Sequence, residues 1–179
     1  MNEEERMSAI KAMAGEMAEG VMKEGKDHML KHGYVPGAVI GFDGHGKCRV
    51  SLPMEWGSPQ ERSRVLLTFK ILLMIRGVIL YTVIHEAWAK AYMGEEAMKA
   101  VESHQWGDIS KEPDREEIIS VLVVSHYHVE ARACKVIREG GEGTKVIGFE
   151  DMEHQAFTDG DLANLIPRRE GSGGVDPRR

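Results

Sequence analysis

Two histidines in the second half of the chain have the residue type and spacing best suited to chemistry. His126 and His128 are separated by one residue in a segment with an extended pattern, so both imidazoles would project to one face of a strand. Imidazole is a common ligand of zinc and other divalent metals, and His85 or Glu86 could complete such a site from a neighbouring strand. The pattern is compatible with a metal-dependent hydrolase that uses a His-x-His pair. The other interpretation is that Ser125 and the two histidines form a solvated hairpin end, which needs no cofactor.

The better-known catalytic motifs are incomplete in this sequence. His85 and Glu86 begin the zinc-protease pattern H-E-x-x-H, but Ala89 stands where the second histidine is required. The serines in apolar segments lack the Gly-x-Ser-x-Gly context of a nucleophile elbow, and neither cysteine lies near the start of an expected helix. We therefore expect a non-catalytic protein, with the metal-dependent hydrolase as the alternative.

Trp88 and Arg115 are candidate contacts for a ligand or a partner. Trp88 ends the same strand as Glu86, where an indole can form a ligand platform or cap a core. Arg115 is a candidate for a cross-strand ion pair with Glu86, and Glu116 with Arg132 is a second candidate pair. Exposed pairs of this kind contribute at most about 1 kcal/mol to stability, so neither pair would fix the fold by itself.

The composition excludes several classes of function. The chain has 179 residues, a formal net charge of −6 and 42% apolar residues, which argues for a globular protein and against a general binder of nucleic acid or of anionic membranes. The only dense basic cluster lies within 168–179, in a Gly- and Ser-containing tail that we expect to be disordered. The longest apolar run, at 78–84, is too short to span a bilayer. The acidic N-terminal segment lacks the features of a signal peptide, and two cysteines, which we expect to be buried thiols, favour a reducing cytoplasm.

The segment 58–88 is the one around which the other elements are expected to pack. Ser58 suits the N-cap of a helix, Pro59 its first position and Glu61 the reciprocal carboxylate, while Gly77 can end the helix in a left-handed conformation. The alternating apolar run at 78–88 then predicts a central strand. One apolar helix face is expected to pack on the sheet, formed by Val65, Leu66, Phe69, Leu72 and Leu73.

The remaining pattern predicts one α+β domain over 1–167. Residues 3–32 predict a long helix with a methionine-rich stripe, which either packs on the sheet or docks on another chain. Residues 89–112 show no convincing face and are expected to form an insertion with one short helix. Further strands are predicted at 38–42, 47–52, 116–127, 129–137 and 145–149. The order helix, strand, strand, helix and four strands predicts a mainly antiparallel sheet of five or six strands with two helices packed on it.

A short pattern resembles a group of uncharacterised bacterial and phage proteins. It consists of Glu86-Ala87-Trp88 at a strand end, followed by Pro113-Asp114-Arg115-Glu116-Glu117 before a β-branched strand. The resemblance covers roughly residues 34–167 and implies the helix, hairpin, helix and sheet layout, in a protein associated with a phage or a mobile element. The stretch between Trp88 and Pro113 is longer in this chain than in that group. The resemblance implies no activity, because the group has no known function.

Together these observations predict a non-catalytic cytoplasmic interaction domain. It would bind a protein partner or form a homodimer through its methionine-rich helix or an exposed sheet edge, and it would need no cofactor. The alternative is the metal-dependent hydrolase, with zinc or another divalent metal bound by His126, His128, His85 and Glu86.

Overall fold

The structure, a computed structural model, describes residues 3–89, 115–152 and 165. Within these residues the elements follow in the order α1 (Glu3–His32), β1 (Ala38–Phe42), β2 (Cys48–Pro53), α2 (Pro59–Ile75), β3 (Leu80–Ala89), β4 (Glu116–Ser125), β5 (Val129–Arg138) and β6 (Val146–Asp151). The predicted α+β class and the predicted order of elements are confirmed. The expected insertion, apart from Ala89 at its start, and the expected tail from residue 168 lie outside the described residues.

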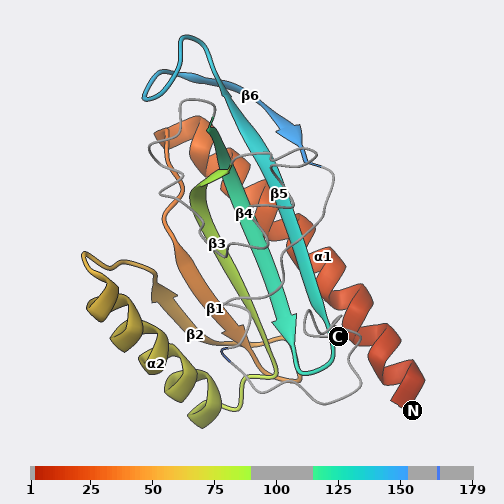
Figure 1. Cartoon of the computed structure of the whole chain (residues 1–179). Coiled ribbons are helices and arrows are strands. Elements are labelled where there is room, and N and C mark those ends of the chain that lie inside the picture. Colours follow the sequence, from red (N-terminus) through yellow and green to blue (C-terminus); the bar gives the residue numbers. More distant parts are fainter. Residues whose placement is uncertain (1–2, 90–114, 153–164, 166–179) are drawn as a thin grey trace, which may run out of the picture.

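The described strands form one antiparallel sheet in the order β2-β1-β3-β4-β5-β6 (Figure 1). The longest strands, β3, β4 and β5, stand side by side in its middle, and the six-residue strands β2 and β6 form its edges. Leu80 pairs with Ser125 and Ala89 with Glu116, which fixes the register between β3 and β4. This register decides which polar side chains of the two strands can meet.

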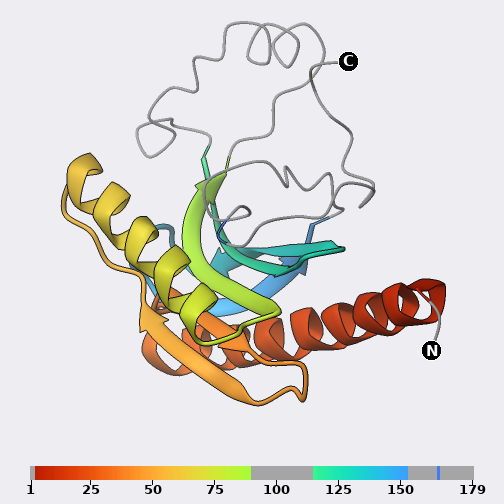
Figure 2. The same cartoon turned by 90° about the horizontal axis from the view of Figure 1, so that it is seen from below.

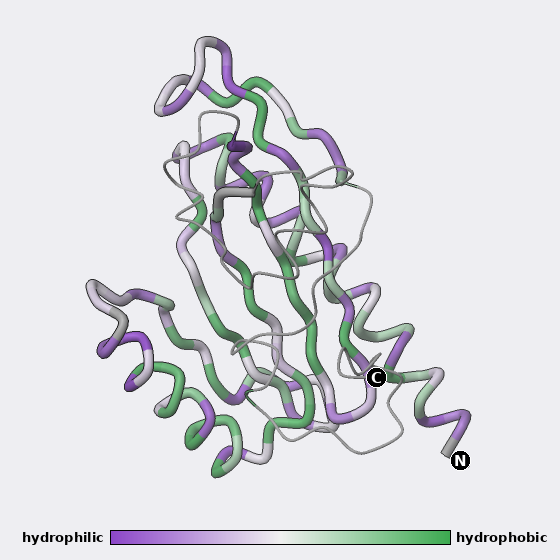
Figure 3. Tube along the Cα trace, in the orientation of Figure 1, coloured by the Kyte–Doolittle hydropathy of each residue, from purple (hydrophilic) through white to green (hydrophobic). Residues whose placement is uncertain are grey.

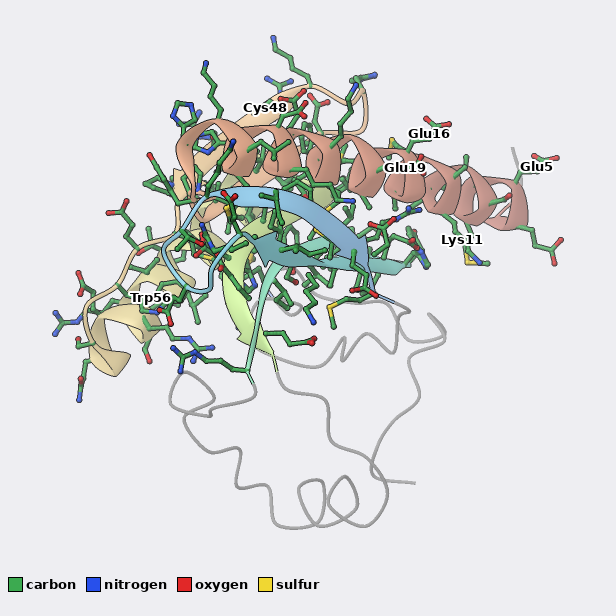
Figure 4. The ribbon with its side chains drawn as sticks, turned by 90° about the horizontal axis from the view of Figure 1, so that it is seen from above. Glu5, Lys11, Glu16, Glu19, Cys48 and Trp56 are labelled. Carbon is green, nitrogen blue, oxygen red and sulfur yellow. The ribbon has the colours of Figure 1, made fainter. Side chains whose placement is uncertain are left out.

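The two helices lie on opposite faces of the curved sheet (Figure 2). Helix α1 packs on β3, β4, β5 and β6. Its methionine-rich stripe contributes to the core on that face, as the packing alternative predicts. The buried apolar residues of α1 are Ile10, Ala14, Ala18, Met22 and Met29, of which Ile10, Ala14 and Met22 belong to the predicted stripe. The first turns of α1 extend past the sheet, and residues 4–9 are exposed. Figure 4 shows Glu5 and Glu16 projecting from α1 away from the sheet.

Helix α2 packs over the other face, at the β1–β2 side of the sheet. Its start is set as predicted: the Ser58 hydroxyl oxygen accepts a hydrogen bond from the backbone N–H of Glu61 at 3.2 Å, and the Glu61 carboxylate accepts one from Gly57 at 2.7 Å. Gly77 ends the helical segment with φ of 63°. Leu66, Phe69 and Leu73 reach the sheet, where they join a second core cluster with Val39, Val50, Tyr81, Val83, Val124 and Leu165.

Both cysteines have the free thiol, but only Cys134 is buried. Cys48 begins the edge strand β2 and is exposed, so the prediction of two buried thiols is wrong for it. In the part of the chain that the structure describes, no helix is long and apolar enough to cross a membrane.

Candidate functional site

The sheet register separates the four residues of the predicted metal site. His126 and His128 lie in the turn that follows Ser125, and Ser125 pairs with Leu80. His85 pairs with Ser120, five residues further along β3, which corresponds to a separation of about 17 Å along the strand. Glu86 lies on the opposite face from His85, because neighbouring residues of a strand alternate. The structure therefore does not bring the four residues together.

The two turn histidines have structural partners of their own. The Ser125 hydroxyl accepts hydrogen bonds from the backbone N–H groups of Tyr127 and His128, at 3.2 and 2.9 Å, and donates one to the carbonyl of His128. The His128 ring nitrogen Nε2 lies 3.2 Å from a carboxylate oxygen of Glu130. His126 is beside the Tyr127 ring, with the ring centres 6.5 Å apart. These contacts organise a tight turn between β4 and β5.

His85 is half-buried in β3. Burial lowers its pKa below the usual value of 6.5, so the ring is neutral at neutral pH. Its Nδ1 lies 3.3 Å from the backbone carbonyl of Glu86. Among the described residues, no group of three or more His, Cys, Asp or Glu side chains is arranged to hold a metal ion.

Glu86 belongs instead to a polar network between the sheet and the end of α1. Its Oε2 accepts a hydrogen bond from the backbone N–H of Val35 at 3.1 Å. Burial raises the pKa of the Glu86 carboxyl, and the neighbouring Glu117 carboxylate raises it further. Glu117 itself is buried and holds Arg138 through two hydrogen bonds of 2.7 and 2.5 Å. Arg138 also donates to the carbonyl of Gly33, so the network ties the segment after α1 to β3, β4 and β5.

The expected ion pairs are replaced by others. Arg115 lies 2.5 Å from a carboxylate oxygen of Glu142, not beside Glu86. Glu116 pairs with Lys135 and not with Arg132, because Arg132 stands opposite Val121 in the β4–β5 register. Trp88 is in β3, and its backbone pairs with that of Glu117 in β4. The structure does not describe the side chain of Trp88. The proposed ligand or partner roles of Trp88 and Arg115 remain predictions.

The outer face of α2 carries an apolar surface that the sequence analysis did not single out. Leu67, Ile71, Met74 and Ile75 recur at helical spacing and are 58%, 51%, 63% and 69% exposed. We call these four side chains the α2 outer face. They lie on the other side of the helix from the residues that α2 packs on the sheet, so the helix is apolar on two sides. Figure 3 shows that much of α2 is coloured as hydrophobic.

Charged residues accompany the α2 outer face. Arg64 and Lys70 are exposed on the same helix. Helix α2 contains three basic residues, Arg62, Arg64 and Lys70, and one acidic residue, Glu61, so its net charge is +2, in a chain whose net charge is −6. The surface is therefore apolar with basic flanks. The sequence indicates this second apolar face through one feature: nine of the 17 residues of the helix are apolar, more than a single face can hold.

A groove lies between α1 and β1 on the opposite side of the molecule. It has a volume of about 650 Å³, within the range of small-ligand sites. Its walls are largely apolar and include Met17, Val21, Ala38, Ile40 and Ile84. Polar groups from α1 also line it, namely Glu24, Asp27, His28, Lys31 and His32. This groove forms because α1 covers β3 to β6 and leaves β1 uncovered at its side.

Comparison of the chain with protein-family models, with curated proteins and with solved structures found no match in any of the three.

Proposed function

We propose that the chain is a non-catalytic interaction domain that self-associates through the α2 outer face. The observation that supports this is the exposure of four large apolar side chains on one side of a short helix. Soluble monomers rarely expose contiguous apolar patches larger than a few hundred Å². A partner surface over α2 would remove these side chains from water.

Two other surfaces are weaker candidates for the contact. The methionine-rich stripe of α1 is used in the core, where Met22 is 7% and Met29 0% exposed. The edge strands β2 and β6 have six residues each, and short edge strands present few unpaired backbone groups to another chain. The exposed apolar side chains therefore favour α2 as the contact surface.

The charges favour a second copy of this chain as the partner. Helix α2 carries a net charge of +2, so the rest of the chain carries −6 − 2 = −8. A second copy thus offers a predominantly acidic surface to a basic, apolar helix. Complementary charges of this kind favour the encounter and fix the orientation of the partners.

The test is the mass of the protein in solution, measured by light scattering over a wide range of concentration. We expect the mean mass to rise with concentration. The variant Ile71→Ser/Met74→Ser should associate at least about tenfold more weakly, because each buried apolar side chain contributes on the order of 1.5 kcal/mol.

The matched control is Lys11→Ser/Glu16→Ser, which changes two exposed residues of α1, far from the α2 outer face, and leaves the net charge unchanged. It should associate like the native chain, and both variants should unfold at the native temperature because the changes are on the surface. A single-chain mass at every concentration would overturn the proposal. So would equal association of the native chain and Ile71→Ser/Met74→Ser.

A further inference from the structure

His28 and His32 lie on successive turns of α1, near its C-terminal end. Residues four apart are neighbours on a helix surface, and the centres of the two rings are 4.4 Å apart, with the ring planes tilted by 39°. Both rings line the groove between α1 and β1, together with Glu24 and Asp27. Two imidazoles are thus placed side by side at the border of one solvent-accessible space.

The orientation of His28 is fixed by a hydrogen bond outside the pair. Its Nδ1 lies 2.8 Å from the backbone carbonyl oxygen of Tyr34. A carbonyl oxygen can only accept, so Nδ1 carries the proton and donates it, and in the neutral ring the lone pair is left on Nε2. Histidines that bind metals usually donate their other ring N–H to a carbonyl or carboxylate in this way.

The ring separation is compatible with one ion between the two side chains. A metal bound at 2.0–2.1 Å from a ring nitrogen lies roughly 3.2 Å from the centre of that ring. Two centres 4.4 Å apart would then subtend an angle of about 90° at the ion. This angle suits the tetragonal geometry of Cu²⁺ and Ni²⁺ better than the tetrahedral geometry of Zn²⁺.

We propose that His28 and His32 form a two-histidine binding site for a divalent transition-metal ion of the Cu²⁺ or Ni²⁺ class. No third His, Cys, Asp or Glu side chain of the described residues joins them in a metal-holding arrangement, so water fills the other coordination positions. Glu24, one turn before His28, adds a negative charge at the same groove. Such a site binds its ion reversibly and is open on one side. It is separate from the α2 outer face and does not depend on self-association.

The experiment is a calorimetric titration of the untagged chain with Ni²⁺ and with Cu²⁺. It is carried out in a Cys48→Ser background, because the exposed thiol of Cys48 is a competing ligand. We expect one ion per chain, and electron paramagnetic resonance of the Cu²⁺ form should show coupling to two nitrogens. The variant His28→Gln/His32→Gln should lose this binding and unfold at the native temperature.

Two controls separate this site from binding by any histidine. His45→Gln changes an exposed histidine of the β1–β2 turn and should leave the titration unchanged. Asp27→His/His28→Gln keeps the number of histidines at eight but places the pair five residues apart, on different sides of the helix, and should lose the binding.

Three results would overturn the proposal. The first is the absence of uptake by the native chain, and the second is full binding by the Asp27→His/His28→Gln variant. The third is loss of binding on His126→Gln/His128→Gln with retention in His28→Gln/His32→Gln, which would place the ion at the β4–β5 turn instead.

Discussion

At the scale of single residues, Glu86 is a side chain whose ionised form is disfavoured in the folded protein. It accepts a hydrogen bond from Val35, but its carboxylate is partly removed from water and lies near the Glu117 carboxylate. Glu117 is compensated by its two hydrogen bonds with Arg138, and both side chains of that pair are less than 10% exposed. For Glu86, burial and the nearby Glu117 carboxylate outweigh the hydrogen bond from Val35 and the attraction of Arg138, so its pKa is raised.

Glu86→Gln should therefore stabilise the protein at neutral pH. The folded-state pKa of Glu86 lies above its ordinary value of 4.5, so its contribution to stability is fully present below about pH 4.5 and is lost as pH rises through the raised value. A glutamine is neutral at every pH and its oxygen can still accept the N–H of Val35. Urea unfolding at pH 7 and at pH 4 should show a higher unfolding free energy for the variant at pH 7 only.

The control for this measurement is Glu55→Gln, which changes an exposed carboxylate in the loop before α2. Its effect should be the same at both pH values, because solvent screens an exposed charge in both states. A Glu86→Gln variant that is destabilised at pH 7 would show that the ionised carboxylate stabilises the fold.

At the scale of elements, the packing of α2 on the sheet depends on Gly41 in β1. A Cβ atom at this position would lie 2.7 Å from Leu73 Cδ2 and 2.8 Å from Val78 Cγ2, closer than such atoms can approach. Gly41→Ala should therefore lower the unfolding free energy by about 1–3 kcal/mol, as overpacking of a filled core does. Chemical denaturation followed by circular dichroism measures this directly.

Gly148 in β6 is the matched position. It is also a strand glycine, but no atom lies within 4 Å of the Cβ that alanine would add. Gly148→Ala should be neutral or stabilising by up to about 1 kcal/mol, because alanine loses less conformational freedom on folding. Equal losses in the two variants would mean that strand geometry, and not the contact with α2, explains the requirement for glycine.

The elements themselves were largely predictable from local patterns. Ser58, Pro59 and Glu61 specify the start of α2 through contacts within one turn, and these contacts occur as expected. The second apolar face of α2 was not predicted. One apolar face explained Leu66, Phe69 and Leu73, and the other apolar residues were not assigned to a second, exposed face.

The candidate metal site depended on information that local patterns lack. Alternation along β3 is enough to put His85 and Glu86 on opposite faces, because it follows from strand geometry alone. Which residue of β4 stands beside His85 depends on the register, and this pairs it with Ser120 rather than with the turn histidines. Similarly, the pair of Glu117 and Arg138 joins residues 21 positions apart on neighbouring strands. Register of this kind is set by the whole sheet.

At the scale of the whole molecule, the distribution of charge determines how copies of the chain can meet. A symmetric contact between two α2 outer faces would bring two helices of net charge +2 together. A head-to-tail contact instead places α2 of one copy on the acidic remainder of the next, which carries −8. We therefore expect the head-to-tail arrangement, which uses two different surfaces and does not stop at a dimer unless a ring closes.

This arrangement predicts a definite response to salt. Charge attraction between exposed groups is screened over about 8–10 Å at physiological ionic strength and over a few ångströms at 1 M, so association should weaken as salt rises. Arg64→Gln/Lys70→Gln lowers the net charge of α2 from +2 to zero, so it should weaken association at low salt and make it nearly insensitive to further salt, since the attraction is gone. Sedimentation velocity across a salt series measures both effects and also shows whether species larger than two chains form. The opposite result would be a mass that reaches a limit of two chains as concentration rises, with association that becomes stronger as salt is added. It would indicate a symmetric contact held by the apolar side chains of α2 alone.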